Sequence, residues 1–60
     1  MQIQTERGLI TVEAEYQSAE RAKMDGYSYT FTDKKYGDLY SKITSEDGHS
    51  RSFALIVGYV

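Results

Sequence analysis

Few residues in the chain are of a type that could carry out metal or acid–base chemistry. The single histidine, His49, follows Glu46 and Asp47 in the segment "SEDGH", and these three side chains are of metal-ligand type. A tight turn rarely converges three ligands, and the segment lacks the alternating acidic positions and terminal Glu of a calcium loop. Cysteine is absent, so there is neither a thiolate metal site nor a disulfide. We therefore expect no metal and no cofactor.

Catalytic arrangements are equally sparse. Ser, His and Asp all occur, but not in the context of a nucleophile elbow, and no glycine-rich loop could cradle a phosphate. Glu13 and Glu15 are expected to point together off a strand as solubility residues. A 60-residue chain also has little room for a closed pocket of the usual size. We therefore predict that the protein is not an enzyme.

The segment "DGYSYTFTD", residues 25–33, places Tyr27, Tyr29 and Phe31 at every second position. This alternation is typical of the covered face of a half-buried strand. The other interpretation is an aromatic platform on which single-stranded nucleic acid stacks beside cations. The cations would be Lys34, Lys35 and Lys42. Nearby aspartates disfavour the platform, so we predict that the three rings belong to the core.

The charge balance argues in the same direction. A net charge of −2 gives no general attraction to nucleic acid, and two adjacent lysines are too few for a basic patch. No apolar run approaches the roughly 20 residues of a membrane span. The first residues, "MQIQTERG", lack the basic and apolar pattern of a signal peptide. We expect a cytoplasmic protein that binds neither nucleic acid nor membrane.

The first half of the chain predicts a hairpin followed by a helix. Apolar and polar residues alternate over residues 1–14, with Arg7-Gly8 between the two runs. Strong helix formers follow, with Ser18 as a candidate N-cap and Gly26 as a candidate C′ residue. We expect at most three helical turns ending near Asp25. The start is open, because residues 13–17 also fit a helical period.

The second half predicts three strands, in "GYSYTFTD", "DLYSKITS" and "RSFALIVGYV". A three-residue loop at residues 46–48, with Gly48 in the left-handed region, joins the last two. This register places Leu39 opposite Leu55, and Ser41 opposite Phe53, so one face becomes mostly apolar. A slip of one residue would exchange the faces, so burial should select this register.

The opposite face of the last two strands is the candidate partner contact. We expect the helix to cover the face of Phe53 and Leu55, which leaves the other face in solvent. The candidate contact residues on that exposed face are Tyr40, Lys42, Ala54 and Ile56, with Val60 beside them. The last strand is apolar on both faces, and a domain this small with one short helix can cover only one of them. An exposed apolar strip marks an interaction site.

The segments "DGYSYTFTD", "DLYSK" and "SFAL" resemble short uncharacterised proteins encoded by conjugative transposons and phages of Gram-positive bacteria. The resemblance covers about residues 8–55 and includes the same order of hairpin, short helix and strands. It implies a mobile-element setting and carries no activity and no site residue. The segment "EAEYQSAERAKM" is longer than in the proteins it resembles.

Taken together, the sequence predicts one α+β domain spanning residues 1–60. Its elements follow the order ββαβββ, with a curled antiparallel sheet and one short helix packed on one face. The expected function is a non-enzymatic interaction protein, an accessory factor of a mobile element or phage that binds a protein partner or itself. The alternative is a weak binder of single-stranded nucleic acid that uses the outer sheet face.

Overall fold

The computed structural model describes residues 1–57 and contains one sheet and one short helix. The elements are β1 (Gln2–Thr5), β2 (Gly8–Tyr16), α1 (Ala19–Met24), β3 (Ser28–Asp33), β4 (Gly37–Ile43) and β5 (Arg51–Ile56). The predicted order ββαβββ is confirmed, although strands dominate and the helix is minor. No helix in residues 1–57 is long and apolar enough to cross a membrane.

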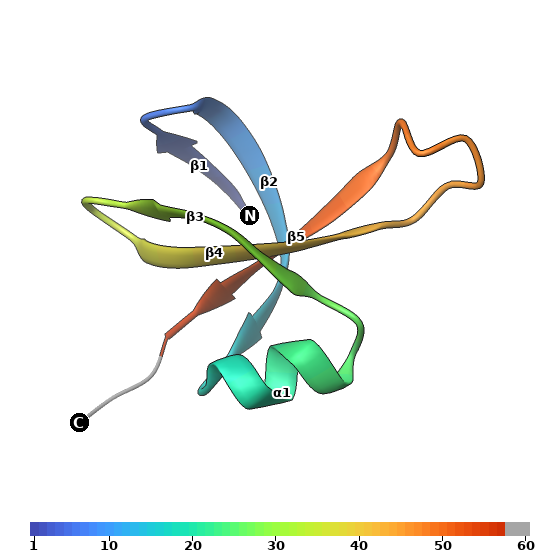
Figure 1. Ribbon diagram of the computed structural model, residues 1–60. Helices are drawn as coiled ribbons and strands as arrows, with labels where there is room; N and C mark the ends of the chain where they lie inside the picture. Colours follow the sequence, from blue (N-terminus) through green and yellow to red (C-terminus); the bar gives the residue numbers. More distant parts are fainter. Residues whose placement is uncertain (58–60) are drawn as a thin grey trace.

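The sheet is mixed, with strand order β1-β2-β5-β4-β3, and it curls strongly (Figure 1). The prediction of an all-antiparallel sheet was wrong, because β2 and β5 pair in parallel from Val12↔Phe53 to Tyr16↔Ile56. The helical connection returns the chain to begin β3 in the same direction as β2. Two antiparallel pairings, β3 with β4 and β4 with β5, then give β5 that direction as well.

The last hairpin has the register expected from its alternation. Leu39 pairs with Leu55, Ser41 with Phe53, and Ile43 with Arg51. The ladder continues into the loop, where the backbone N–H of Thr44 donates to the Ser50 carbonyl. Gly48 has a φ of +78°, a value that a glycine adopts without strain. The predicted three-residue turn at residues 46–48 is therefore confirmed.

The two faces of the sheet are covered in different ways. On the inner face the sheet curls over its own core, which consists of Ile3, Ile10, Val12, Phe31, Leu39 and Leu55. The outer face is covered by α1, with a second cluster of Ala22, Tyr27, Tyr40 and Ala54. The prediction that the helix covers the face of Leu55 was wrong. The curl leaves no space for a helix there, so α1 lies on the other face, as Figure 1 shows below the sheet.

Small side chains allow α1 to lie close to the sheet. Ala22 is fully buried, and Ala19 packs against the same cluster, facing Ala14 and Ala54. Ser18 caps the helix as predicted, since its Oγ accepts a hydrogen bond from the backbone N–H of Arg21 at 3.4 Å. The question of the helix start is resolved, because residues 13–16 belong to β2.

The aromatic residues at positions 27, 29 and 31 do not share one face. Phe31 belongs to the inner core and Tyr27 to the cluster under α1, whereas Tyr29 is 55% exposed. The pairing of β3 with β4 shifts between Tyr29 and Phe31, so a β-bulge interrupts the alternation. The prediction is confirmed for burial of Tyr27 and Phe31, and it was wrong for Tyr29 and for the single shared face.

Candidate functional site

The predicted contact residues lie together, but beneath the helix instead of in solvent. Tyr40 pairs directly with Ala54, and their side chains are 5% and 0% exposed. Ile56 is half-buried and packs against the same cluster. Lys42 is half-buried, with its Nζ 4.6 Å from the centre of the Tyr27 ring and 3.2 Å from the backbone oxygen of Asp25. The prediction of a solvent-exposed face at these positions was therefore wrong.

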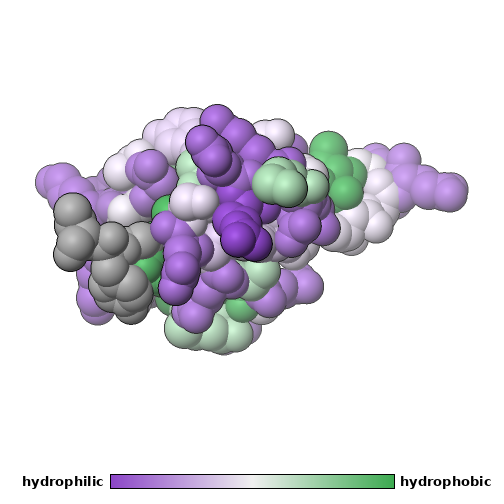
Figure 2. All heavy atoms as spheres, turned by 90° about the horizontal axis from the view of Figure 1, so that it is seen from below, coloured by the Kyte–Doolittle hydropathy of each residue, from purple (hydrophilic) through white to green (hydrophobic). Residues whose placement is uncertain are grey.

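The surface that contains α1 also lacks a continuous apolar strip. Figure 2 views the molecule from this side and shows mostly hydrophilic residues, with apolar residues in small separate patches. Val60, which the sequence placed on this strip, lies outside the described residues.

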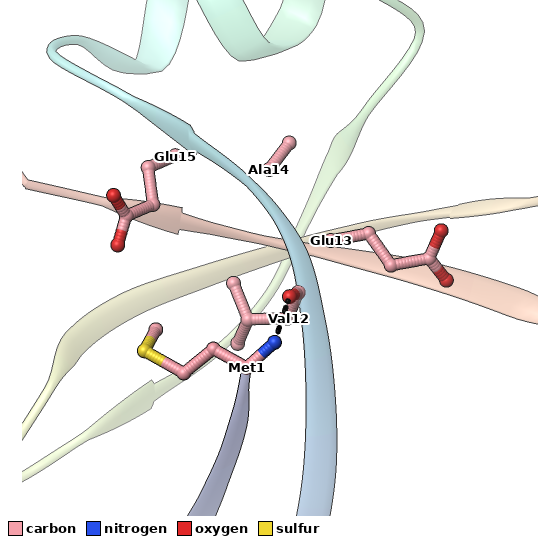
Figure 3. A pocket seen from close by; sticks show the side chains of 5 residues that line it. All are labelled: Met1, Val12, Glu13, Ala14 and Glu15. Carbon is pink, nitrogen blue, oxygen red and sulfur yellow. Dashed lines mark hydrogen bonds between the residues drawn. The ribbon is translucent and has the colours of Figure 1, made fainter.

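The acidic residues singled out in the sequence do not converge on a site. Glu13 and Glu15 border an open hollow of about 490 Å³ beside Met1, and Figure 3 shows them pointing to opposite sides of β2. The expectation that they point together was wrong, because a register shift between Val12 and Ala14 interrupts the alternation. Within residues 1–57, no three His, Cys, Asp or Glu side chains are grouped so as to hold a metal ion.

Asp47 has a role within its own turn. Its carboxylate accepts hydrogen bonds from the Ser45 hydroxyl at 2.6 Å and from the backbone N–H of His49 at 3.0 Å. These bonds hold the pKa of the Asp47 carboxyl below its ordinary value of 3.8, and the bond from Ser45 has the largest effect. The interpretation of "SEDGH" as an ordinary turn agrees with this geometry.

A different feature has the character of a binding site: a groove of about 430 Å³ between the first hairpin and the strands β3 and β5. Its lining residues are Arg7, Leu9, Ile10, Thr30, Phe31, Arg51 and Phe53. The first three come from the hairpin, and the others come from β3 and β5. The groove exists because β2 changes neighbours along its length. Residues 8–11 pair only with β1, and pairing with β5 starts at Val12.

The groove has an apolar interior and a cationic border. Ile10 and Phe31 are buried and Phe53 is half-buried, while Leu9 is 62% exposed at the entrance. Arg7 and Arg51 are exposed, and no acidic residue lines the groove. The groove is therefore locally positive, although the net charge of the chain is −2. The groove can therefore attract an anion that also has apolar surface.

Both guanidinium groups are held in place. The guanidinium carbon of Arg7 lies 4.8 Å from the centre of the Phe31 ring, a cation–π contact. The Nη1 of Arg51 donates to the hydroxyl oxygen of Ser41 at 3.4 Å, and Ser41 is in turn 2.6 Å from the Thr30 hydroxyl. An arginine has five N–H donors, and within residues 1–57 the hydrogen bond to Ser41 uses only one of those on Arg51.

Sequence reasoning missed this site for an identifiable reason. The sequence pattern indicates a turn at Arg7 and predicts no role for Arg51. The two arginines are far apart in the chain and belong to no motif. Both line one groove because β2 pairs in parallel with β5. No residue pattern within either segment could have indicated it.

Comparison with models of known protein families, with curated proteins and with solved structures gives no match for this chain.

Proposed function

We propose that the protein is a small non-enzymatic binding domain that holds an acidic segment of another protein in the arginine-flanked groove. The observation that carries the proposal is that one groove has two oriented guanidinium groups at its border and apolar side chains in its interior. Arginine binds carboxylates through paired N–H donors, while the rings and Ile10 provide surface for apolar side chains. The resemblance to mobile-element proteins suggests a setting for such a partner.

The chemistry of the groove favours binding over catalysis. Its charged groups are two guanidiniums, and its other polar side chain is the Thr30 hydroxyl. Such a set attracts and orients an anion, but it has no carboxylate, imidazole or thiol that could act as a general acid or base. The proposal therefore retains the expectation that the protein is not an enzyme.

A protein partner is favoured over single-stranded nucleic acid, the alternative function. A stacking platform needs open ring faces beside cations, but the Phe31 ring is buried and in contact with Arg7. The outer sheet face, which the alternative would use, is covered over Tyr40 and Ala54 by α1. The net charge of −2 also opposes a long polyanion more than a short acidic peptide.

The test uses a capped heptapeptide of alternating valine and glutamate, titrated to millimolar concentration and followed through the backbone amide signals in NMR spectra. We expect the largest shifts at the groove residues and weaker binding at higher salt. Replacing both cations, in Arg7→Gln/Arg51→Gln, should reduce the affinity about tenfold or more, because two charge-assisted contacts are lost.

The matched control is Arg21→Gln/Lys23→Gln, which removes the same charge from exposed positions on α1. It should leave the affinity unchanged. A peptide that fails to bind, or that binds both variants equally, would contradict the proposal. A thymidine oligonucleotide that binds in the groove more tightly than the acidic peptide would favour the nucleic-acid alternative.

A further inference from the structure

One border of the groove is the edge of a strand. Leu9 and Ile10 are consecutive in β2, so their side chains leave the strand on opposite faces, yet both line the groove. Ile10 is buried in the inner core and Leu9 is exposed. A cavity bordered by both residues must follow the backbone edge of β2 between them. The groove therefore borders on hydrogen-bonding groups of the main chain as well as on side chains.

The hydrogen bonds of β1 show which backbone groups of β2 point into this groove. The Met1 ammonium donates to the Val12 carbonyl at 3.2 Å, and the Val12 N–H donates to the Met1 carbonyl at 2.6 Å. In an antiparallel ladder such bonded pairs alternate with non-bonded pairs. Ile3↔Ile10 is therefore the next bonded pair, and Leu9 and Thr11, on either side of Ile10, direct their backbone groups away from β1.

These groups face the part of the sheet where β5 has not yet begun to pair with β2. The first β2–β5 partners are Val12↔Phe53, so neither Leu9 nor Thr11 has a partner residue in β5. The exposed Leu9 side chain lies beside this edge. A strand edge with free donors and acceptors is a template for a further strand.

We propose that the acidic partner segment binds in an extended conformation, as an added strand paired with β2 at Leu9 and Thr11. The inference rests on the proposed function and specifies its binding mode. Strand addition takes affinity from the main chain and specificity from alternate side chains. Apolar side chains of the segment pack on Ile10 and Phe53 in the groove interior, and its carboxylates reach Arg7 and Arg51 at the border. The preferred partner sequence therefore combines apolar and acidic residues.

Hydrogen exchange tests the free edge before any ligand is added. In the free protein the amide hydrogens of Leu9 and Thr11 should exchange much faster than those of Ile10 and Val12, which bond to β1. Addition of the valine–glutamate heptapeptide should slow exchange at Leu9 and Thr11 by about tenfold once about nine-tenths of the protein is bound, because exchange then occurs from the remaining free fraction. Slow exchange at Leu9 and Thr11 in the free protein would overturn the inference.

Two backbone-modified peptides provide the sharper test. In one, each valine amide is replaced by an ester, and in the other each glutamate amide is replaced; both keep every side chain and charge but lose N–H donors on one edge of the strand. Because an added strand pairs through a single edge, one analogue should bind about tenfold more weakly and the other should match the parent. Equal affinity of both analogues, without protection of Leu9, would overturn strand addition.

The outcomes separate this inference from the function on which it rests. If the peptide binds with the expected dependence on Arg7 and Arg51 but leaves Leu9 and Thr11 unprotected, the groove binds acidic segments and strand addition is wrong. If the peptide does not bind at all, the proposed function itself is wrong. Unchanged amide spectra of the arginine variants would show that any loss of binding does not come from misfolding.

Discussion

The carboxylate of Asp33 accepts a hydrogen bond from the backbone N–H of Glu6 at 2.9 Å, which ties the turn of the first hairpin to the end of β3. The same carboxylate accepts from the backbone N–H groups of Lys35 at 3.0 Å and Tyr36 at 3.2 Å. One buried side chain thus fixes two turns that are distant in sequence. The inner core lies between the strands that these turns connect.

These contacts make the stability of the protein sensitive to acid. The hydrogen bond from Glu6 is the largest of several effects that hold the pKa of Asp33 below its ordinary value of 3.8. The unfolded chain therefore binds the proton more strongly than the folded protein does, so acid favours unfolding. The stabilisation is complete above the ordinary pKa and disappears as the pH falls through the folded value. Asp33→Asn should flatten the decline in melting temperature below pH 4, relative to wild type.

Circular dichroism melts at a series of pH values measure this effect, and Asp47→Asn is the matched control. The pKa of Asp47 is also lowered, but its bonds stay within one exposed turn. Asp33→Asn should lower the melting temperature at neutral pH more than Asp47→Asn does. If Asp33→Asn lowers the melting temperature by the same amount as Asp47→Asn, or by less, Asp33 does not hold the two turns together.

Tyr16 should ionise later than an ordinary tyrosine. Its hydroxyl donates to the Asp25 carboxylate at 2.5 Å, and this bond is the main reason that its pKa rises from 10.0 to about 12. The folded protein then holds the phenolic proton more tightly than the unfolded chain, so this contribution to stability is lost as the pH rises from about 10 to about 12. The difference in phenolate absorbance between wild type and Tyr16→Phe gives the titration curve of this residue.

Asp25→Asn is the corresponding control for Tyr16. It removes the charge and the strongest acceptor while keeping the size of the side chain, so the pKa of Tyr16 should return toward 10.0. If Tyr16 titrates at the same pH in this variant as in wild type, the hydrogen bond is not the cause of the shift.

Phe31 and Tyr29 should differ sharply in their contribution to stability, although they are two positions apart in one strand. Phe31 is 7% exposed in the inner core, so Phe31→Ala should cost about 3–5 kcal/mol. Tyr29 is 55% exposed and meets Tyr40 edge-to-face at 5.8 Å, so Tyr29→Ala should cost only about 1 kcal/mol. Urea unfolding of both variants compares them, and similar losses would contradict the bulge between the two residues.

Ile56→Lys should destabilise the fold, contrary to the behaviour expected of a surface contact. Ile56 packs against the cluster under α1, where a lysine would lose apolar burial and bring a charge beside Tyr40 and Ala54. We expect a loss of about 2 kcal/mol in the free energy of unfolding. Ile43→Lys makes the same change at a side chain that is 54% exposed, and it should cost below about 0.5 kcal/mol. Equal losses in urea unfolding would place Ile56 on the surface after all.

The features that follow from local pattern were predictable from the sequence. The pairing of Leu39 with Leu55 follows from alternation and the left-handed Gly48, and Ser18 is the N-cap for which its residue type made it a candidate, although the pattern left the helix start open. Each depends on residues close in the chain or on one hairpin with one apolar face. Such signals are strong because a slip would expose a whole row of apolar side chains.

The features that depend on long-range topology were not predictable in the same way. A bulge separates Tyr29 from Phe31, and nothing in the alternation of β3 indicates it. The outer face containing Tyr40 and Ala54 was expected in solvent because the alternation within single strands does not indicate that the sheet curls over its own core. The groove between Arg7 and Arg51 was not predictable either, since it requires both the curl and the parallel pairing of β2 with β5.

The division of β2 between two neighbours also has a consequence for folding kinetics. The β1–β2 hairpin and the β3–β4–β5 meander each form from contacts between consecutive strands, which close short loops quickly. To join these two parts, Val12 must pair with Phe53, which is far away in the chain. Closing the loop between them costs chain entropy before the inner core is complete. We expect the rate-limiting step to be this docking of two preformed halves. Substitutions at the Val12–Phe53 junction should then slow folding, whereas substitutions at the hairpin tips should mainly accelerate unfolding.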